Sequence, residues 1–253
     1  MIRHLYRYPV KGLSGEPLKS VTLLAGLGIP IDRSVAIARK PGLFDPAAPV
    51  ALTKDKFLML MRDEALARLI TRYDEGSGIL SVARPGAADA RYALREDEGR
   101  RALAAFLRDH VGGGLDPVVV AADGHQFTDI SVVSPEKMRA ISLINLASVG
   151  ALAHAIAKPV DHRRFRANIY FDGVAPWAEL DWVDREITVG AARLRITMRT
   201  RRCAATQVNP ETAERDINIP GEIKRHFGHF DMGVYGEVIE GGAITRGQPV
   251  IIA

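Results

Sequence analysis

The stretch Val-Gly-Ala-Ala-Arg-Leu-Arg-Ile-Thr-Met at residues 189–198 decides the fold class, because apolar and polar side chains alternate through it. Successive side chains of a strand point to opposite faces of a sheet. Leu194, Ile196 and Met198 would therefore face one side, and the intervening arginines and threonine the other. This pattern predicts a strand whose sheet has one buried face.

Other parts of the chain carry similar short apolar segments, and we predict further strands at residues 79–83, 118–121, 169–171 and 234–239. The run 241–252 predicts a glycine turn that leads into a last strand. Helical periodicity is clear in two segments, one that starts near Asp97 and one at 149–156, which Lys158-Pro159 ends. The second half of 59–70 is also predicted to be helical.

Regular helices do not separate these strands, which argues against a doubly wound α/β sheet. The sequence therefore predicts a β-rich α+β fold with barrel-like sheets and a few helices. Gly112-Gly113-Gly114 is the obvious flexible joint. We place a boundary there, with an N-terminal β-barrel-like domain at 1–114 and a second β-barrel domain at 115–253.

The composition of the 253 residues excludes several classes of protein. An apolar content of 47% is that of a globular chain, not of a disordered one. A single cysteine excludes a disulfide framework, a paired-cysteine zinc site and a cysteine-ligated iron–sulfur cluster. The net charge of +4 suits a protein that handles an anion, but is too small for nucleic-acid coating. No signal peptide or membrane helix is apparent, so we expect a cytoplasmic protein without a nucleic-acid or membrane partner.

Cys203 follows Arg201 and Arg202 at the end of the alternating strand. A lone cysteine is commonly a small buried apolar residue. Nearby positive charge favours the thiolate, which is the form that binds metals. The arginines therefore indicate a cysteine at the rim of an anion site. A cysteine–histidine pair for nucleophilic catalysis stays open, because such partners meet in space and not in sequence.

Three arginines lie close together in Asp161-His162-Arg163-Arg164-Phe165-Arg166-Ala167-Asn168. This segment is either a solvated loop or an anion clamp, since guanidinium groups grip phosphate or carboxylate in a bidentate way. Tyr8-Pro9-Val10-Lys11-Gly12 is a strand end followed by a turn, without the spacing of a phosphate-binding P-loop. The histidines show no metal-ligand spacing; the nearest pair is His226 and His229.

Taken together, these residues resemble the MOSC family with its N-terminal β-barrel domain. The N-terminal resemblance is carried by Tyr8-Pro9-Val10-Lys11-Gly12, Gly26-Leu27, Asp32-Arg33 and Leu52-Thr53. The C-terminal resemblance is carried by Asn145-Leu146-Ala147-Ser148-Val149, Arg164-Phe165-Arg166-Ala167-Asn168-Ile169, Trp177-Ala178-Glu179-Leu180-Asp181-Trp182, Arg201-Arg202-Cys203, Thr206-Gln207-Val208-Asn209-Pro210-Glu211-Thr212, Gly233-Val234-Tyr235 and the final run from Gly241-Gly242 to Val250.

The architecture is similar to that of the mitochondrial amidoxime-reducing component and its bacterial relatives. The resemblance implies a molybdenum–molybdopterin cofactor between two domains, with Cys203 as metal ligand and catalytic residue. It implies cofactor contacts from Lys11, Arg33, Arg166, Asn168, Arg202 and Tyr235. Gly12 stands where relatives often have a small hydroxyl residue.

The function implied is a molybdenum-dependent oxidoreductase that reduces a small N-hydroxylated substrate. Electrons would come from a separate iron–sulfur or flavin protein, which we expect to dock on the basic surface around Arg163, Arg164 and Arg201. Two alternatives remain. Cys203 could carry sulfur for delivery to a metal cofactor, or the chain could be a non-catalytic cofactor-binding module.

Overall fold

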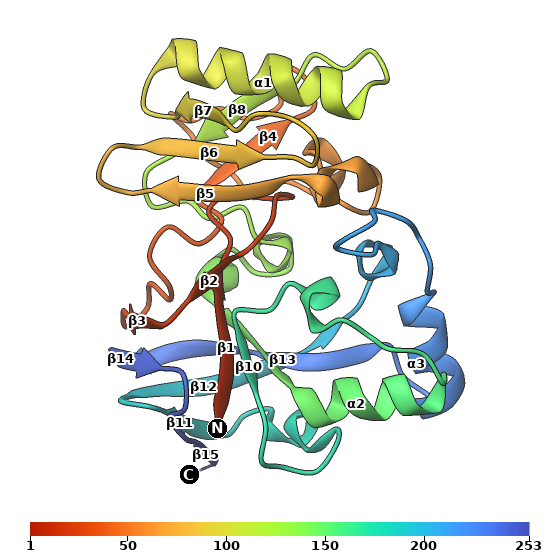
Figure 1. Ribbon diagram of the computed structural model, residues 1–253. Coiled ribbons are helices and arrows are strands. Elements are labelled where there is room, and N and C mark those ends of the chain that lie inside the picture. The colour runs from red at the N-terminus through yellow and green to blue at the C-terminus, as the bar shows by residue number, and fades with distance from the viewer. Residues whose placement is uncertain (253) are drawn as a thin grey trace.

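The computed structural model describes residues 1–252. Its largest element is a curled eight-stranded sheet in the lower half of the molecule (Figure 1). In spatial order its strands are β15 (Val250–Ile252), β11 (Glu186–Val189), β12 (Ala192–Arg201), β13 (Asp231–Glu240), β9 (Ile141–Asn145), β10 (Ile169–Phe171), β1 (Ile2–Arg7) and β2 (Glu16–Leu18). Neighbouring strands are antiparallel except β9 and β10, which are parallel.

The strand predicted from residues 189–198 is confirmed from Ala192 onward. Leu194 and Ile196 are fully buried in the core of the large sheet, while Arg195 is exposed. The hairpin that joins β11 to β12 turns at Gly190, whose φ of +57° suits glycine. The first predicted residue, Val189, therefore belongs to the preceding strand.

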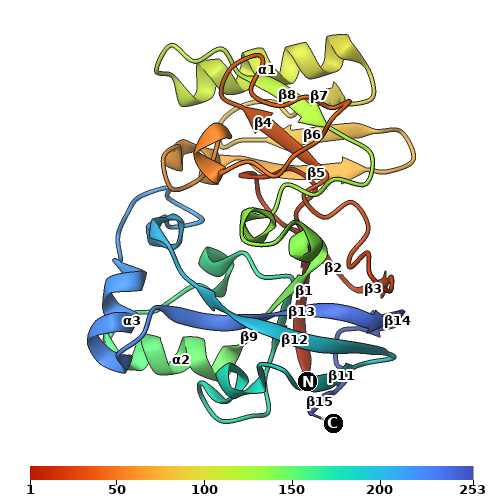
Figure 2. The same cartoon turned by 180° about the vertical axis from the view of Figure 1, so that it is seen from behind.

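The upper half of the molecule contains two smaller sheets beneath a helix (Figure 2). Helix α1 (Asp97–Val111) buries Leu103 and Leu107 against them, as its amphipathic spacing predicts. The sheets are formed by β4 (Val35–Ala38) with β8 (Val118–Ala121), and by β5 (Ile70–Asp74), β6 (Ile79–Ala83) and β7 (Ala90–Ala93).

Two helices cover the lower sheet, and short elements complete the chain. The remaining elements are α2 (Leu146–Ala155), α3 (Ile219–Phe227), the strand pair β3 (Ser20–Leu23) and β14 (Gly242–Thr245), and the 3₁₀ helices η1 (Lys54–Lys56), η2 (Glu64–Arg68), η3 (Asp129–Val132), η4 (Pro135–Arg139), η5 (His162–Phe165), η6 (Ala178–Trp182) and η7 (Ala204–Gln207). The β-rich α+β class is confirmed. Within residues 1–252, no helix is long and apolar enough to span a membrane.

The helical second half predicted for 59–70 is present as a short 3₁₀ helix, η2, which ends at Arg68 before β5 begins at Ile70. Leu66 and Leu69, the C-cap, are both buried at a spacing of three residues, the repeat of a 3₁₀ helix. Helix α3 was not predicted. Its start is marked by Asn218, whose side chain accepts a hydrogen bond from the Gly221 N–H, and by Pro220 in the first turn.

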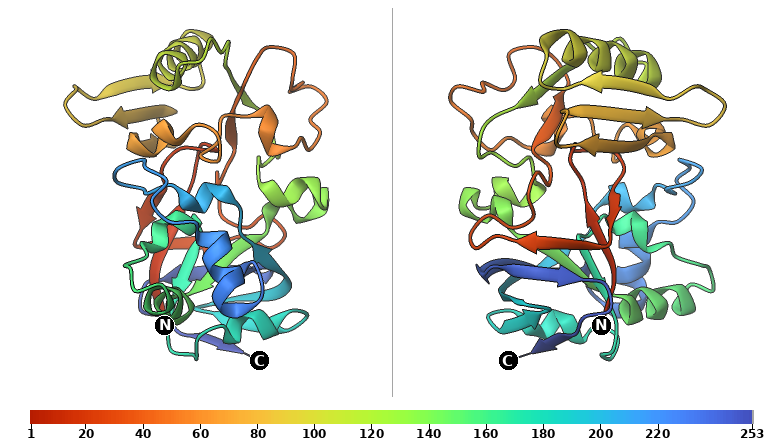
Figure 3. Two further views of the ribbon diagram at one scale, coloured as in Figure 1. Left: turned by 90° about the vertical axis from the view of Figure 1, so that its right-hand side faces the viewer. Right: turned by 60° about the vertical axis from the view of Figure 1, so that its left-hand side comes forward.

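The chain crosses between the two halves several times (Figure 3). Strands β1 and β2 precede the predicted boundary at residue 114 but lie in the lower sheet, while β8 follows that boundary and pairs with β4. The division into 1–114 and 115–253 stays a prediction. What matters for the site is that residues from the first turn and from the lower sheet meet where the halves join.

Candidate functional site

A cleft of about 200 Å³ lies between the two halves and gathers the predicted site residues. All seven side chains named from the sequence line it: Lys11, Arg33, Arg166, Asn168, Arg202, Cys203 and Tyr235. They come from the turn after β1, the segment before β4, the segment before β10, the end of β12, and β13. No local sequence signal places these segments side by side, so the pairing of β1, β9, β10, β12 and β13 is what assembles the cleft.

The cleft is strongly cationic. Among the described residues that line it, one carboxylate, Asp129, stands against seven basic side chains: Lys11, Arg33, Lys54, Arg164, Arg166, Arg201 and Arg202. Like charges gathered in a partly buried cleft repel one another, and a bound anion relieves that repulsion. The cleft therefore suits a ligand with negative charge.

Tyr8 lies between two of these arginines. The guanidinium groups of Arg33 and Arg166 each sit 4.6 Å from the centre of its ring, and Arg33 donates to the Arg166 carbonyl at 2.9 Å. Burial raises the pKa of the Tyr8 hydroxyl to about 12, so the ring stays neutral. Asp32 forms an ion pair with Arg33. Cation–π contacts thus fix both guanidinium groups while only one of them has a carboxylate partner.

Arg166 is a partly buried cation of the cleft without a polar partner in the described chain. Its side chain has no hydrogen-bond or ion-pair partner among residues 1–252, and burial lowers the pKa of its guanidinium. Its backbone is left-handed, with φ +53°, which turns the residue away from the end of η5. A charged group that is partly buried without a partner is costly, so Arg166 is poised to bind an anion.

Arg202, the residue before Cys203, ties the end of β12 to β13 and to η5. Its guanidinium donates to the carbonyl oxygens of Met232 at 2.8 Å and of Phe165 at 3.0 Å, and burial lowers its pKa. Cys203 itself is half-buried in the cleft, and its carbonyl accepts hydrogen bonds from the backbone and hydroxyl of Thr206. The thiol is therefore accessible and held on a fixed backbone, as a metal ligand would require.

Lys11, Lys54 and Asp129 form a charged group across the cleft. The Lys11 ammonium donates to the Phe127 carbonyl at 3.0 Å and forms an ion pair with Asp129. Burial lowers its pKa despite that partner. Lys54 lies 3.8 Å from the other Asp129 oxygen. Burial opposes the charge of Lys54, yet the nearby Asp129 carboxylate and Cys203 outweigh it and raise the pKa of this ammonium.

The chain matches the family model of the MOSC domain over residues 122–251, about half of its length. The chain belongs to the MOSC family. A curated relative, mitochondrial amidoxime-reducing component 1 from Xenopus laevis, is 31% identical over 136 residues. That match covers 49% of this chain and 39% of the relative. Family membership supports a function associated with the molybdenum cofactor.

Three solved structures of bacterial proteins also match this chain. The YuaD protein from Bacillus subtilis matches 99% of this chain and 93% of its own, with 11% identity and a TM-score of 0.45. The YiiM proteins from Geobacillus stearothermophilus and Escherichia coli match 45% of this chain and 53% of theirs, with TM-scores of 0.36 and 0.32 and identities of 17% and 13%.

Asn168 and Tyr235, two of the predicted cofactor contacts, differ in how they are held in the structure. Asn168 is buried, and its side-chain oxygen accepts from the Ser142 hydroxyl at 2.9 Å while its amide donates to the Tyr6 carbonyl at 3.3 Å. It therefore joins β1 to β9 beneath the cleft. Tyr235 lies on β13, and burial raises the pKa of its hydroxyl. Its neutral hydroxyl is a hydrogen-bond donor on the cleft wall.

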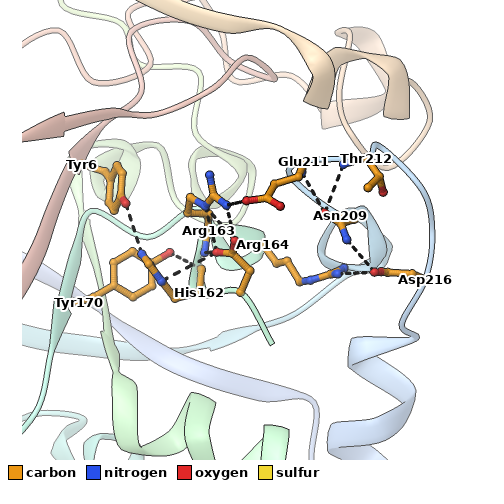
Figure 4. A network of polar contacts seen from close by, with 10 residues as sticks. Tyr6, His162, Arg163, Arg164, Tyr170, Asn209, Glu211, Thr212 and Asp216 are labelled. Atoms are coloured by element: carbon orange, nitrogen blue, oxygen red, sulfur yellow. Dashed lines mark hydrogen bonds and ion pairs between the residues drawn. The ribbon is translucent and has the colours of Figure 1, made fainter. Parts of the chain in front are cut away.

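Two of the three clustered arginines do not belong to an open anion clamp. Arg163 is paired with Asp161 and Glu211, and Arg164 is paired with Asp216 at 2.7 Å (Figure 4). Arg164 is only 4% exposed, so its place in the predicted docking surface for an electron carrier is wrong. Their spacing in the sequence indicates one unit, but neighbouring residues of a 3₁₀ turn point in different directions.

Sequence reasoning missed Lys54 and Asp129 on the cleft wall, and Thr200. The Thr200 hydroxyl is buried and has no hydrogen-bond partner among the described residues, although its side chain lines the cleft. Within those residues no group of three or more histidine, cysteine, aspartate or glutamate side chains is placed to hold a metal. Lys54, Asp129 and Thr200 stand in no recognisable sequence motif, because their neighbours in the cleft come from distant parts of the chain.

Gly12 lies on the cleft wall, where the backbone leaves little room for a side chain. Its φ is +85°, and an added Cβ would lie 2.7 Å from the Leu58 carbonyl oxygen. We expect Gly12→Ser to lower the free energy of unfolding by roughly 1–3 kcal/mol, because left-handed strain and a clash combine. Urea unfolding of the wild type and the variant measures this difference in the free energy of unfolding. Gly86→Ser is the matched control, since Gly86 has φ +75° but open space around it and should lose less. Equal losses would show that the Leu58 contact is unimportant.

Proposed function

We propose that this chain binds a molybdenum–molybdopterin cofactor in the cleft and reduces N-hydroxylated compounds with electrons from a separate donor protein. The observation that carries the proposal is the meeting of one accessible thiol with seven basic side chains in a single cleft. The amidoxime-reducing name of the curated relative supports the substrate class, although the match covers 39% of that relative.

The residues fit such a cofactor on three counts. Arg166 is a cation without a partner in the described chain, which suits the phosphate of a pterin. The Thr200 hydroxyl is buried without a hydrogen-bond partner in the same part of the structure. Cys203 offers a soft thiolate, the ligand type that accompanies sulfur-bound transition metals.

In this proposal Cys203 would ligate the metal, while Lys11, Arg33 and Arg166 would bind the anionic end of the cofactor. Asn168 would hold the strands beneath it, and Arg202 and Tyr235 would donate hydrogen bonds. The cofactor, when bound, supplies the transfer of two electrons. Together with two protons these convert N–OH to N–H and release water. The chain contributes binding, charge compensation and an enclosed site.

Metal and sulfur analysis of the purified protein tests the proposal. We expect about one molybdenum and one pterin for each chain. Sulfur that cyanide releases, without any metal, would instead support the sulfur-carrier alternative. Pterin and metal at full occupancy without turnover by any reductant would support the cofactor-binding module.

The electron source gives a separate prediction. With NADH alone, the purified chain should not reduce an amidoxime, because one cysteine cannot build an iron–sulfur relay and no Gly-x-Gly-x-x-Gly motif follows a predicted strand. An artificial one-electron donor should restore turnover. Reaction rates with and without that donor measure the effect, and turnover driven by NADH in flavin-free protein would contradict it.

A further inference from the structure

A second cavity, of about 530 Å³, lies beside the cleft, and most of its lining residues have no part in the proposed function. The two cavities share Gly12, Leu60, Arg164 and Arg166 as lining residues, so they adjoin each other. The second one is bounded by β1, the turn after it, η2 and the segment around Pro210. Its volume lies within the range of roughly 300–1,000 Å³ that small-molecule sites occupy.

Most of the wall of this second cavity is apolar. The apolar lining residues are Leu13, Pro17, Leu60, Leu66, Ala67, Leu69, Ile70, Pro85, Val208 and Pro210. Leu66 and Leu69 are buried, whereas Ile70 is 67% exposed. An exposed large apolar side chain at a cavity gains free energy when a ligand with an apolar body covers it.

The polar part of the wall is cationic. Among the described residues, the single carboxylate of Glu211 faces four arginines: Arg68, Arg163, Arg164 and Arg166. Figure 4 shows that Arg163 and Arg164 already have carboxylate partners. Arg68 and Arg166 have no ion-pair or hydrogen-bond partner for their guanidinium groups within residues 1–252. Two positive charges without a partner in the described chain, the exposed Arg68 and the partly buried Arg166, next to an apolar wall complement a molecule with the opposite charge and an apolar body.

We propose that this cavity is a binding site for an apolar organic anion, a carboxylate with an aromatic or alkyl body. The carboxylate pairs with Arg68 and Arg166, and the body covers Ile70 and Leu69. This site is distinct from the cofactor cleft, because Arg68 and Ile70 line the second cavity alone. Arg166 belongs to both, so occupancy of one site alters affinity at the other, and the coupling is reciprocal.

Calorimetric titration of the purified chain with 2-naphthoate and with its neutral analogue 2-naphthamide tests the charge. We expect naphthoate to bind about tenfold more tightly, because a charge-assisted contact is lost in the amide. Arg68→Gln should lower the affinity for naphthoate by about tenfold and leave that for naphthamide unchanged. Arg72→Gln is the matched control, since Arg72 is exposed on β5 outside the cavity and should change neither.

The apolar wall is tested by Ile70→Asp, which should weaken both ligands, with Ile251→Asp on the exposed face of β15 as its control. Thermal unfolding of each variant checks that the fold is intact. Equal affinity for the two ligands, or equal effects of Arg68→Gln and Arg72→Gln, would overturn the anion site. Absence of naphthoate binding at millimolar concentration would overturn it also. None of these measurements requires turnover. Because Arg166 belongs to both sites, the wild type and the variants are compared at the same measured molybdenum content.

Discussion

Replacing Cys203 by serine should abolish molybdenum binding while the fold persists. Cys203 is the single thiol of the sequence and lies half-buried in the cationic cleft, where it lines the wall beside Arg202 and Thr200. Oxygen is a poor replacement for sulfur at a metal that is otherwise held by sulfur ligands. Because the side chain is not in a hydrophobic core cluster, the exchange of sulfur for oxygen should leave the unfolding transition close to that of the wild type.

Molybdenum and pterin contents of both proteins, measured after identical purification, check this expectation. Ala205→Ser is the matched control, because Ala205 lines the same wall and also receives a hydroxyl, but carries no thiol. The control should retain metal. A Cys203→Ser protein with unchanged metal content, visible absorption and activity would show that the cysteine is structural.

Elements with a local signature could be predicted from the sequence. Helix α1 follows from apolar residues at helical spacing, and β6, β8 and β10 were predicted with the bounds that the structure shows. Helix α3 was not predicted, although Ile219, Ile223 and Phe227 recur at helical spacing between its caps, Asn218 and Gly228. Its nine residues show that spacing over only about two turns. Strand β9 is buried throughout, so no alternation reveals it.

The site could be predicted in part, for a physical reason. Residues such as Lys11 and Cys203 stand in motifs whose order along the chain is recognisable. Lys54 and Asp129 do not, because they matter through ion pairs between distant segments: Asp129 pairs with Lys11 and with Lys54. Likewise Arg164 and Arg166 look equivalent in the sequence, but the salt bridge to Asp216 occupies only the first.

Arg166→Met should weaken cofactor retention by roughly tenfold to hundredfold, which corresponds to the loss of a charge-assisted contact of about 1.5–3 kcal/mol. Arg166 is the cleanest cation for this test. Its guanidinium stacks on Tyr8 but has no hydrogen-bond or ion-pair partner in residues 1–252, so its removal leaves no protein group unpaired. Methionine keeps much of the apolar stem, and stability should therefore be nearly unchanged.

Lys11→Met is compared with Arg166→Met, because Lys11, unlike Arg166, has partners in the protein. It forms an ion pair with Asp129 and donates to the Phe127 carbonyl. Its loss should lower both cofactor retention and the free energy of unfolding, since a buried acceptor is left without its donor. Pterin content after gel filtration and urea unfolding of the cofactor-free protein separate the two effects. Arg108→Met is the control. It lies at an exposed position of α1 and should change neither cofactor retention nor the free energy of unfolding. If Arg166→Met retained pterin like the wild type while Lys11→Met only lost stability, the cationic cleft would be a structural feature, and the proposed cofactor would have to bind elsewhere.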